Sequence, residues 1–401
     1  MTTVTRNTDL RAQSADLDAW EPCVAAGEDV VIYTGNWFAA CSLDGGQTFS
    51  SIDPNSLCTP HGEAMCCDQV VIYAPSIRVF LWLIQTDAGN YVLGVASPDE
   101  LRNSNGLAWT TYLIPADRFG GAGAQMDFPE VALGDHYLYI AFNLLGGDRG
   151  ESPIGLRLSL STLAERAQTW LTFFRASDIW WMRPVQNTGD TGFFVVLSSL
   201  SAVRIYSWPE NASVITWVDV AVATIPEDGF STRMPSGSDW LDPNSKIGAQ
   251  ILGATRSGRD IWVAWNGARR IHDHPEVGDV FPYPHIGMAI IVIGSWATSQ
   301  RYVWNDRHAF AWPALATSVS GDVGLSFCWG GEQWDPQHGV AMLTGPNQVF
   351  QATTSGQTEG AGGHYISIRP LHPSDNQFCA AGFIQTRTTR ENHPHYVVFG
   401  P

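Results

Sequence analysis

Short apolar runs separated by turn residues dominate the chain. Runs of this length, flanked by Gly, Pro, Asn and Asp, predict β-strands buried on both faces. Outside Ser161–Gln168, hardly any stretch spaces its apolar residues helically without a Gly or Pro interrupting it. The runs that predict inner strands are Val70–Tyr73, Val79–Ile84, Val131–Leu133, Tyr137–Leu145, Phe193–Leu200, Ile261–Trp265 and Val323–Trp329.

A second pattern is an aromatic residue that closes a strand after a polar turn, and it occurs seven times. The markers are Phe49, Trp109, Trp170, Trp217, Trp304, Phe350 and Tyr396, with successive spacings of 60, 61, 47, 87, 46 and 46 residues. One four-stranded propeller blade needs about 40 to 50 residues. We therefore predict an all-β, single β-propeller spanning residues 1–401, with the aromatics packed between blades.

The blade count and the closure of the ring follow from the two ends of the chain. Seven blades fit the seven markers, and six is the alternative if the N-terminal unit is incomplete. The last unit, Tyr365–Tyr396, has room for about three strands, so Thr2–Arg11 should supply the fourth. Joining N- and C-terminal strands in one blade removes the exposed sheet edges. Insertions at 117–125, 226–246 and 267–284 should form loops over one face.

Composition agrees with this architecture and narrows the partners. The chain has 17 Trp, 18 Phe, 11 Tyr, 39 Gly and 23 Pro, as expected of many short strands joined by tight turns. Its formal net charge of −17 disfavours nucleic acid and anionic membranes. No apolar stretch of bilayer-spanning length and no signal-peptide core is visible, so we expect a cytoplasmic protein or a secreted one whose signal has been removed. The oligomeric state stays open.

Cysteine and histidine leave alternatives open. Seven cysteines, five of them in the first 67 residues, are an odd number, so at least one is free unless two chains pair. Buried thiols, one or two disulfides, or a metal site all fit this pattern. The pair His272-Asp-His274 could bind zinc on an extended strand with a third ligand elsewhere. No cofactor is required by the sequence, and calcium or zinc are the candidates.

One segment carries a recognisable turn. Ser42-Leu-Asp44-Gly-Gly46-Gln-Thr-Phe49 resembles the Asp-box, or BNR, repeat of sialidase-like β-propellers. A looser copy is Ser97-Pro-Asp99 followed by Gly106-Leu-Ala-Trp109, whereas Ser320-Gly-Asp322 falls too early in its unit to be a third. In such a turn the Ser and Asp side chains bond backbone amides, and glycine supplies a positive φ.

The resemblance implies a class of function without fixing a reaction. It points to sialidases, other glycoside hydrolases, some polysaccharide lyases and sugar-binding modules. True sialidases are six-bladed and clamp a carboxylate with three arginines, the first in an early Arg-Ile-Pro segment. The nearest match here, Arg233-Met-Pro235, lies mid-chain. The chain therefore looks more like uncharacterised bacterial BNR-repeat proteins than like a sialidase.

Polar residues just ahead of the inner strands should face a common funnel. Asp68, Asp127 and Glu130 could supply the acid and base pair of glycoside hydrolysis, with Arg183 orienting the substrate. His61 and Glu63 form a second candidate catalytic pair, and His61 could serve as the base of a lyase. Further candidates that could bind substrate are Asp239 beside Trp240, Arg233, and Trp312. Gln250, His308 and Tyr365 also precede inner strands.

The sequence therefore predicts a carbohydrate-active propeller, a glycoside hydrolase or polysaccharide lyase with one site at the central channel mouth. The alternative is a non-catalytic carbohydrate-binding, lectin-like, or protein-interaction propeller. A lectin should repeat its binding residues in every blade, whereas the residues ahead of the inner strands differ from unit to unit here. No phosphate-binding glycine loop, Gly-x-Ser-x-Gly elbow or Cys-x-x-Cys motif occurs.

Overall fold

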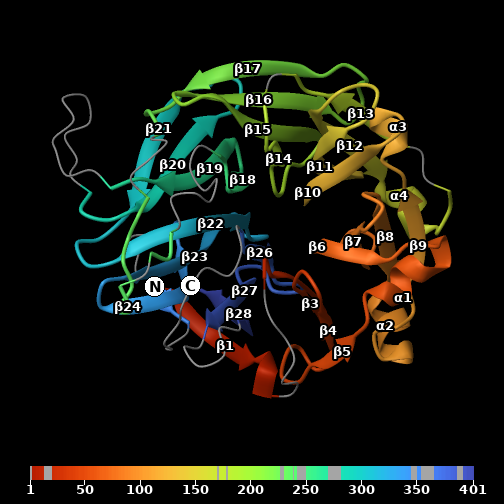
Figure 1. The fold of residues 1–401 in the computed structure, drawn as a ribbon, viewed down its shortest axis with the longest axis horizontal. Helices are drawn as coiled ribbons and strands as arrows, with labels where there is room; N and C mark the ends of the chain where they lie inside the picture. The colour runs from red at the N-terminus through yellow and green to blue at the C-terminus, as the bar shows by residue number, and fades with distance from the viewer. Residues whose placement is uncertain are drawn as a thin grey trace.

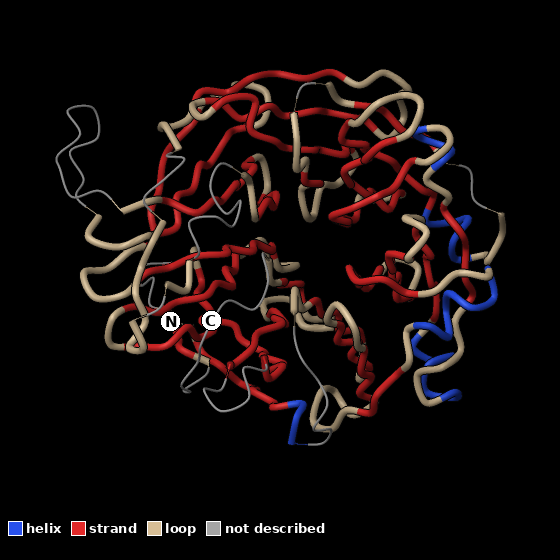
Figure 2. Tube along the Cα trace, in the orientation of Figure 1, coloured by secondary structure: helices blue, strands red, loops and turns tan. Residues whose placement is uncertain are grey.

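The protein is a seven-bladed β-propeller. The computed structural model describes residues 2–12, 20–168, 171–177, 179–225, 230–237, 239–241, 250–269, 281–344, 350–353, 365–385 and 392–401. Their strands form seven four-stranded antiparallel sheets arranged around a central axis (Figures 1 and 2). The predicted fold class and the count of seven blades are confirmed.

The blades follow one another along the chain, and in blades 1 to 6 the strands run in sequence order from the inner to the outer position. Blade 1 is β2 (Cys23–Gly27), β3 (Val30–Thr34), β4 (Ala39–Ser42) and β5 (Ser50–Ile52). Blade 2 is β6 (Met65–Ala74), β7 (Val79–Thr86), β8 (Tyr91–Ala96) and β9 (Thr110–Ile114). Blade 3 is β10 (Ala124–Leu133), β11 (Tyr137–Gly146), β12 (Ser152–Ser159) and β13 (Thr172–Arg175). Blade 4 is β14 (Arg183–Pro184), β15 (Thr191–Ser199), β16 (Ala202–Pro209) and β17 (Thr216–Ala221).

The remaining blades have the same order. Blade 5 is β18 (Gly253–Ser257), β19 (Asp260–Gly267), β20 (His285–Val292) and β21 (Thr298–Val303). Blade 6 is β22 (Ala309–Thr317), β23 (Val323–Gly331), β24 (Trp334–Met342) and β25 (Gln351–Ala352). Blade 7 is β26 (Ser367–Pro370), β27 (Phe378–Gln385), β28 (Asn392–Gly400) and, at its outer edge, β1 (Thr3–Asp9).

Helices are short and connect strands. They are η1 (Leu10–Ala12), α1 (Asn55–Cys58), η2 (Thr59–His61), α2 (Pro98–Ser104), α3 (Asp117–Gly120) and α4 (Leu160–Ala164). The one segment with helical spacing thus contains α4, and the insertion at 117–125 begins as α3. None of the helices in the described ranges is long and apolar enough to cross a membrane.

The ring closes as predicted, by pairing of the two chain ends. Strand β1 runs antiparallel to β28, with Thr3 opposite Gly400 and Asp9 opposite His395. The Oγ1 of Thr2 also accepts a hydrogen bond of 3.0 Å from the backbone N–H of Met342 in blade 6. Blade 7 therefore takes its fourth strand from the N-terminus, which covers the outer edge of β28.

Neighbouring inner strands run in the same direction, as the parallel bridges between Gly27 and His372 and between Gln186 and Thr255 show. All inner strands therefore start at one face of the propeller and end at the other. We call the end of the channel where they start the upper mouth and the opposite end the lower mouth. Strands alternate in direction within a blade, so the second and fourth strands run back to the upper face. The loop after the second strand, such as the β3–β4 loop of blade 1, therefore also lies on the upper face.

Not every apolar run is an inner strand. Val70–Tyr73 and Val131–Leu133 lie in the inner strands β6 and β10, but Phe193–Leu200, Ile261–Trp265 and Val323–Trp329 fall in or beside the second strands β15, β19 and β23. A second strand has a strand on each side and a blade against each face, so it is the most thoroughly buried. The inner strands of blades 4 and 5 carry more polar residues, such as Arg183 in β14 and Arg256 in β18, whereas β22 of blade 6 is almost entirely apolar.

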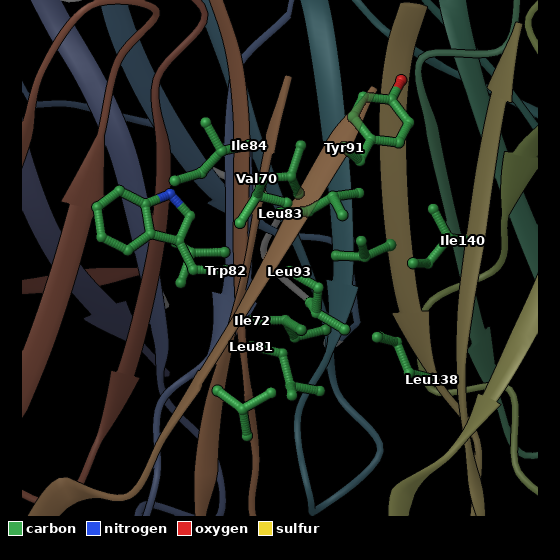
Figure 3. Packing of buried hydrophobic residues seen from close by; sticks show 14 of the residues in the cluster. Val70, Ile72, Leu81, Trp82, Leu83, Ile84, Tyr91, Leu93, Leu138 and Ile140 are labelled. Atoms are coloured by element: carbon green, nitrogen blue, oxygen red, sulfur yellow. The ribbon is translucent and has the colours of Figure 1, made fainter. Parts of the chain in front are cut away.

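Blades pack face to face through these second strands. In blade 2, Val70 and Leu83 share the face that is turned towards Ile140 of blade 3, whereas Ile84 lies on the opposite face with Trp82; all five belong to one apolar cluster (Figure 3). The indole of Trp82 is fully buried in the same cluster and donates a hydrogen bond of 3.1 Å from Nε1 to Gln69. Burying this apolar surface at about 25 cal/mol per Å² is the main stabilisation of the ring.

The repeated aromatics are only partly architectural. Phe49, Trp109 and Phe350 directly precede outer strands, and Phe49 contacts Tyr396 of blade 7 edge to face at 5.8 Å. Trp217 and Trp304 depart from the expectation, since both side chains are exposed and Trp304 follows β21 rather than preceding it. Trp170 lies outside the described residues. The period was informative although two of its markers do not pack between blades.

The turn between β4 and β5 has the bonding that its sequence predicts. Ser42 Oγ accepts from the N–H of Gly46 at 2.7 Å and donates to Asp44 Oδ1 at 2.7 Å. The Asp44 carboxylate accepts from the N–H groups of Gln47 and Thr48, both at 2.9 Å, and from the Thr48 hydroxyl. Partial burial would raise the pKa of Asp44, but these hydrogen bonds lower it to about 2.

The two looser serine motifs fold differently. Ser97 caps helix α2 in a capping box with Glu100, and Asp99 pairs with Arg102 at 2.7 Å instead of closing a turn. Ser320 and Asp322 lie between β22 and β23, where the Ser320 hydroxyl donates to Asp322 at 2.9 Å. Only the first motif forms the turn before an outer strand.

Two glycines of this turn allow a matched test of close packing. Gly45 and Gly46 both have positive φ, 72° and 87°, but only at Gly46 would a Cβ collide with the ring of Tyr396, while Gly45 has open space. We expect Gly45→Ala to cost about 1–2 kcal/mol of unfolding free energy and Gly46→Ala about 2–5 kcal/mol. Urea denaturation measures both, and equal losses would show that the contact with Tyr396 contributes nothing.

The closing blades also contain two buried neutral histidines. Burial lowers the pKa of His338 to about 3 and that of His395 to about 4. In the unfolded chain both titrate near 6.5, so unfolding takes up protons below that pH. Stability should be complete above pH 6.5 and fall by up to about 1.4 kcal/mol per pH unit for each histidine as the pH drops towards 4.

The measurement is the unfolding free energy between pH 7 and pH 4.5. His395→Asn should reduce its slope against pH, whereas His61→Asn, which alters a histidine on the outer face of blade 2, serves as the control. An unchanged slope in His395→Asn would rule out this origin of acid sensitivity.

Candidate functional site

Carboxylates gather where the first three inner strands start. Asp68 lies near the start of β6, Glu21 two residues ahead of β2, and Asp127 on β10 at a bulge. The charges of Glu21 and Asp127 both act on Asp68, and Glu21 also forms a hydrogen bond with it. Two of these three acids were predicted to converge, and the structure brings them together at the upper mouth.

Burial favours the neutral form of Asp68. Its side chain is almost fully buried, and burial raises its pKa well above the usual range, with the neighbouring carboxylates of Glu21 and Asp127 raising it further. Like charges this close cannot all ionise, so one acid keeps its proton. A carboxylic acid that stays protonated near neutral pH is a proton donor.

Glu21 is the member that sequence reasoning missed. It has a left-handed backbone, with φ of 48°, and its Oε2 accepts a hydrogen bond of 2.9 Å from Asn36 Nδ2. Asn36 belongs to the β3–β4 loop, whose next residue is the exposed Trp37. Trp20 and Trp37 contact each other edge to face at 6.4 Å, so two indoles border the acid group.

A buried ion pair joins blades 3 and 4 below these acids. Arg183 Nη1 pairs with Glu130, and Arg183 Nε donates to the backbone oxygen of Ile251 at 2.7 Å. Both side chains are buried, and the guanidinium lies 5.2 Å from the ring centre of Phe128. Arg183 Nη2 has no hydrogen-bond partner in the described structure, so one donor remains for a ligand.

Two tyrosines complete the polar lining. Burial and the charges of Asp68 and its neighbours raise the pKa of Tyr365 and of Tyr91 well above 10. The Tyr365 hydroxyl is close enough to Asp68 to lower the pKa of that acid slightly, but it makes no hydrogen bond of good geometry. The Tyr91 hydroxyl has no hydrogen-bond partner among the described residues. The Tyr91 hydroxyl points away from the apolar cluster (Figure 3).

Three of these residues, Glu130, Arg183 and Tyr365, line one cavity at the centre of the ring. Its empty space is about 450 Å³ including its opening, and its wall takes residues from all seven inner strands or their flanks. Left-handed φ at the non-glycine residues Glu21, Phe128, Trp181 and Trp312 occurs at the upper ends of four blades. Such conformations are uncommon and cluster where a site must be held in one geometry.

A disulfide between neighbouring residues lies beside the acids. Cys66 and Cys67 are bonded to each other and directly precede Asp68 on β6. The other five cysteines are free and buried. Of the alternatives that the sequence left open, the structure thus shows one disulfide and buried thiols. Among the described residues, no group of three His, Cys, Asp or Glu side chains could hold a metal ion.

Tryptophans are concentrated on the upper face. Of the five exposed Trp side chains in the described part of the chain, Trp37, Trp180, Trp304 and Trp334 lie in loops or strand ends on this face, and Trp217 lies on an outer strand. Exposed indoles offer flat apolar surface to a ligand. Because each comes from a different blade, no spacing in the sequence marked them as a group.

The second predicted catalytic pair lies elsewhere, and this prediction is corrected. His61 Nε2 forms a hydrogen bond of 2.9 Å with Thr111 on the outer strand β9. Glu63 accepts from Thr86 at 2.7 Å and from Asn90 at 2.9 Å, which fixes the β7–β8 turn. The two side chains therefore have separate partners, and no hydrogen bond joins them in the described structure.

The predicted sugar-binding loop is also corrected in part. Asp239 accepts from the N–H groups of Thr232 and Leu241, so it shapes its own loop, and Arg233 is exposed beside it. Trp240 and Trp312 are buried and pack edge to face at 5.4 Å, so neither offers a face to a ligand. The adjacent Asp239 and Trp240 therefore have structural roles: Asp239 holds its own loop and Trp240 packs in the core.

Some predictions lie outside the described residues. His272 and His274 fall there, as do parts of the segments 226–246 and 267–284. The predicted zinc pair and the predicted placement of these two loops over one face therefore stay predictions. His308 is described and packs edge to face on Trp329 at 5.0 Å at the upper face.

Comparison with known proteins places the chain by its fold. No protein-family model and no curated protein matches it. Among solved structures, a lectin, BP39L from Burkholderia pseudomallei, superposes with a TM-score of 0.50 at 9% identity, covering 96% of this chain and 98% of the lectin. An α-L-arabinofuranosidase from Fusarium graminearum gives 0.44 at 9% identity, with 98% and 97% covered. An α-L-arabinanase from Penicillium chrysogenum gives 0.44 at 8% identity, with 99% and 98% covered. At these identities the likeness extends to the β-propeller fold.

Proposed function

We propose that the protein is a glycoside hydrolase whose active site is the upper mouth of the channel. The observation that carries the proposal is the group of acids formed by Asp68, Glu21 and Asp127, in which burial and mutual repulsion keep Asp68 protonated. Glycoside hydrolysis needs one carboxylic acid to protonate the leaving oxygen and one carboxylate to act on the anomeric centre or on water.

The residues divide these roles by their surroundings. Asp68, buried and neutral, is the proton donor, and the half-buried Asp127 is the second carboxylate. Arg183 and Tyr365 border the cavity, and each has a buried polar atom without a hydrogen-bond partner, so these two side chains are the candidate donors to sugar hydroxyls. The Trp20–Trp37 pair provides an indole surface at the rim for the apolar face of a sugar ring.

The charge of the mouth favours a neutral sugar. Three carboxyl groups surround it, while the nearby guanidinium of Arg183 is already paired with Glu130. A uronic acid would bring a further negative charge against this group.

Lyase chemistry is the less favoured member of the predicted class. It needs a base that removes a proton beside a carboxylate. The tyrosines at the mouth have pKa values raised well above 10, which makes their ionised form scarce. His61 lies in η2 and forms a hydrogen bond with Thr111 on the outer strand of blade 2.

We also propose that the chain is related to the Asp-box propellers. The bonding of Ser42 and Asp44 in the turn before β5 supports this relationship, although the turn lies on the outer rim and takes no part in the site.

The experiment is a screen of the purified protein against neutral and uronic oligosaccharides, with released reducing ends measured at several pH values. We expect release from a neutral substrate, with activity falling on the alkaline side as the acid loses its proton. Binding without release would favour the second candidate function, a sugar-binding propeller, which the exposed tryptophans of the upper face support. Neither binding nor release would overturn the carbohydrate proposal for the sugars tested.

A further inference from the structure

The lower mouth of the channel opens into a second, larger pocket. It has about 1190 Å³ of empty space, including its opening, and lies where the inner strands end. Much of its wall is apolar, with Ala25, Ile72, Tyr73, Leu133 and Pro370. This pocket is at the opposite end of the channel from the acids of the upper mouth, and nothing in the proposed hydrolysis uses it.

A buried arginine separates this pocket from the channel. Arg369 on β26 is 7% exposed and borders both cavities. Its Nη1 donates to the backbone oxygen of Ile368 at 3.1 Å, and its Nη2 lies 3.8 Å from the sulfur of Cys23. Its Nε has no hydrogen-bond partner, and no carboxylate of the described residues lies within ion-pair distance of its guanidinium.

Other buried arginines of the described chain are better satisfied. Arg183 pairs with Glu130, and Arg157 donates to two backbone oxygens while stacking on Tyr137 and Trp208 at 4.5 and 4.2 Å. Arg369 has one carbonyl and a weak thiol contact, in a chain with 39 acidic residues against 22 basic ones. A buried charge without a counter-charge is destabilising, so its retention indicates an anion that binds there.

We propose that the lower mouth binds a small organic monocarboxylate, with its carboxylate on Arg369 and its apolar body against Ile72 and Leu133. A planar guanidinium and a carboxylate match each other in two hydrogen bonds, and enclosure strengthens the pair. The pocket walls favour an apolar body over a bare inorganic ion. The proposal is independent of the function proposed for the upper mouth.

The other charged and titratable groups at this mouth set the ligand's charge. Burial lowers the pKa of His372, so this side chain is neutral near pH 7 and adds no second positive charge. Asp135, which also borders the pocket, repels a second negative charge. A single carboxylate therefore fits better than a dicarboxylate or a phosphate.

The test is a thermal-shift and calorimetric titration with butyrate, hexanoate and benzoate, using hexanamide, benzamide, chloride and inorganic phosphate for comparison. We expect hexanoate or benzoate to raise the melting temperature and the amides to have no effect. Arg369→Met should weaken binding at least about tenfold, whereas Arg259→Met, at an exposed arginine on the same face, should leave it unchanged.

Two further measurements distinguish a ligand-binding role of Arg369 from a structural one. Without ligand, Arg369→Met should melt at the same temperature as the parent protein or higher, because it removes an uncompensated charge; a clear fall would mean that Arg369 is a structural residue and would overturn the proposal. Arg369→Lys should keep part of the affinity. A response to chloride or phosphate alone, or equal binding of acids by Arg369→Met, would also overturn it.

Discussion

Replacing Asp68 with Asn should reduce hydrolysis by about 10²- to 10⁴-fold and leave the melting temperature unchanged or higher. Asn cannot donate the proton that the leaving oxygen needs. Asn is also uncharged, as the protonated acid is, so it adds no repulsion towards Glu21 or Asp127 and the fold has no reason to lose stability. The measurements are the initial rate on the substrate found in the oligosaccharide screen and a melting curve of the same sample.

The matched control is Glu63→Gln, a carboxylate of the same blade that lies away from the channel. It accepts hydrogen bonds from Thr86 and Asn90, so this substitution should lower stability and leave the rate per folded molecule unchanged. If both substitutions reduced the rate equally, or neither did, Asp68 would not be the proton donor.

Replacing Arg183 with Met should destabilise the protein by about 3–5 kcal/mol, because it leaves Glu130 buried without its partner. Arg183 also ties blade 4 to blade 5 through the backbone oxygen of Ile251, so two blade contacts are lost together. Adding Glu130→Gln should recover a large part of the loss, since it removes the unpaired charge. Urea denaturation of the two single variants and the double variant measures the coupling.

The control for this cycle is Arg204→Met, which breaks an ion pair with Asp219 near the surface of blade 4. Exposed pairs contribute about 0–1 kcal/mol, so the loss should be much smaller. Equal losses at Arg183 and Arg204 would contradict the buried character of the Glu130 pair.

The propeller fold was predictable because its repeating strands are nearly all buried and therefore appear in the sequence as regularly spaced apolar runs. Spacing of Phe49, Trp109 and Phe350 indicated blades, and the short last unit indicated closure by the N-terminus. The sequence could not distinguish inner from second strands, because both are apolar runs of similar length. The runs beginning at Phe193 and Ile261 were assigned to the inner position although the channel edge of those blades is more polar.

The site was predictable where it depended on topology. Arg183 begins β14, while Asp68 lies within β6 and Asp127 and Glu130 lie within β10. Strands of one direction around a ring must start at one mouth. Glu21 was missed because no long apolar run follows it, and its role depends on a left-handed turn and on Asn36 from a neighbouring loop.

The tryptophans show what the sequence could not predict, namely which indoles are buried and which are exposed. Trp240 and Trp312 are buried against each other and Trp37 is exposed, although the local sequence suggested a binding role for Trp240 and Trp312 and none for Trp37. Whether an indole is core or surface depends on which loop covers it, which single-sequence patterns do not specify.

Ring closure through β1 and β28 also affects how the protein can be made. During synthesis β1 is made long before its partner strand, because almost all of the propeller lies between β1 and β28 in the sequence. At about 5–20 residues per second, β1 waits roughly 20–80 seconds with an open edge. Blades 1 to 6 can form in turn during translation, but the circle is completed only once β28 has emerged. Until then the unpaired β1 is a surface that a chaperone must shield from other nascent chains.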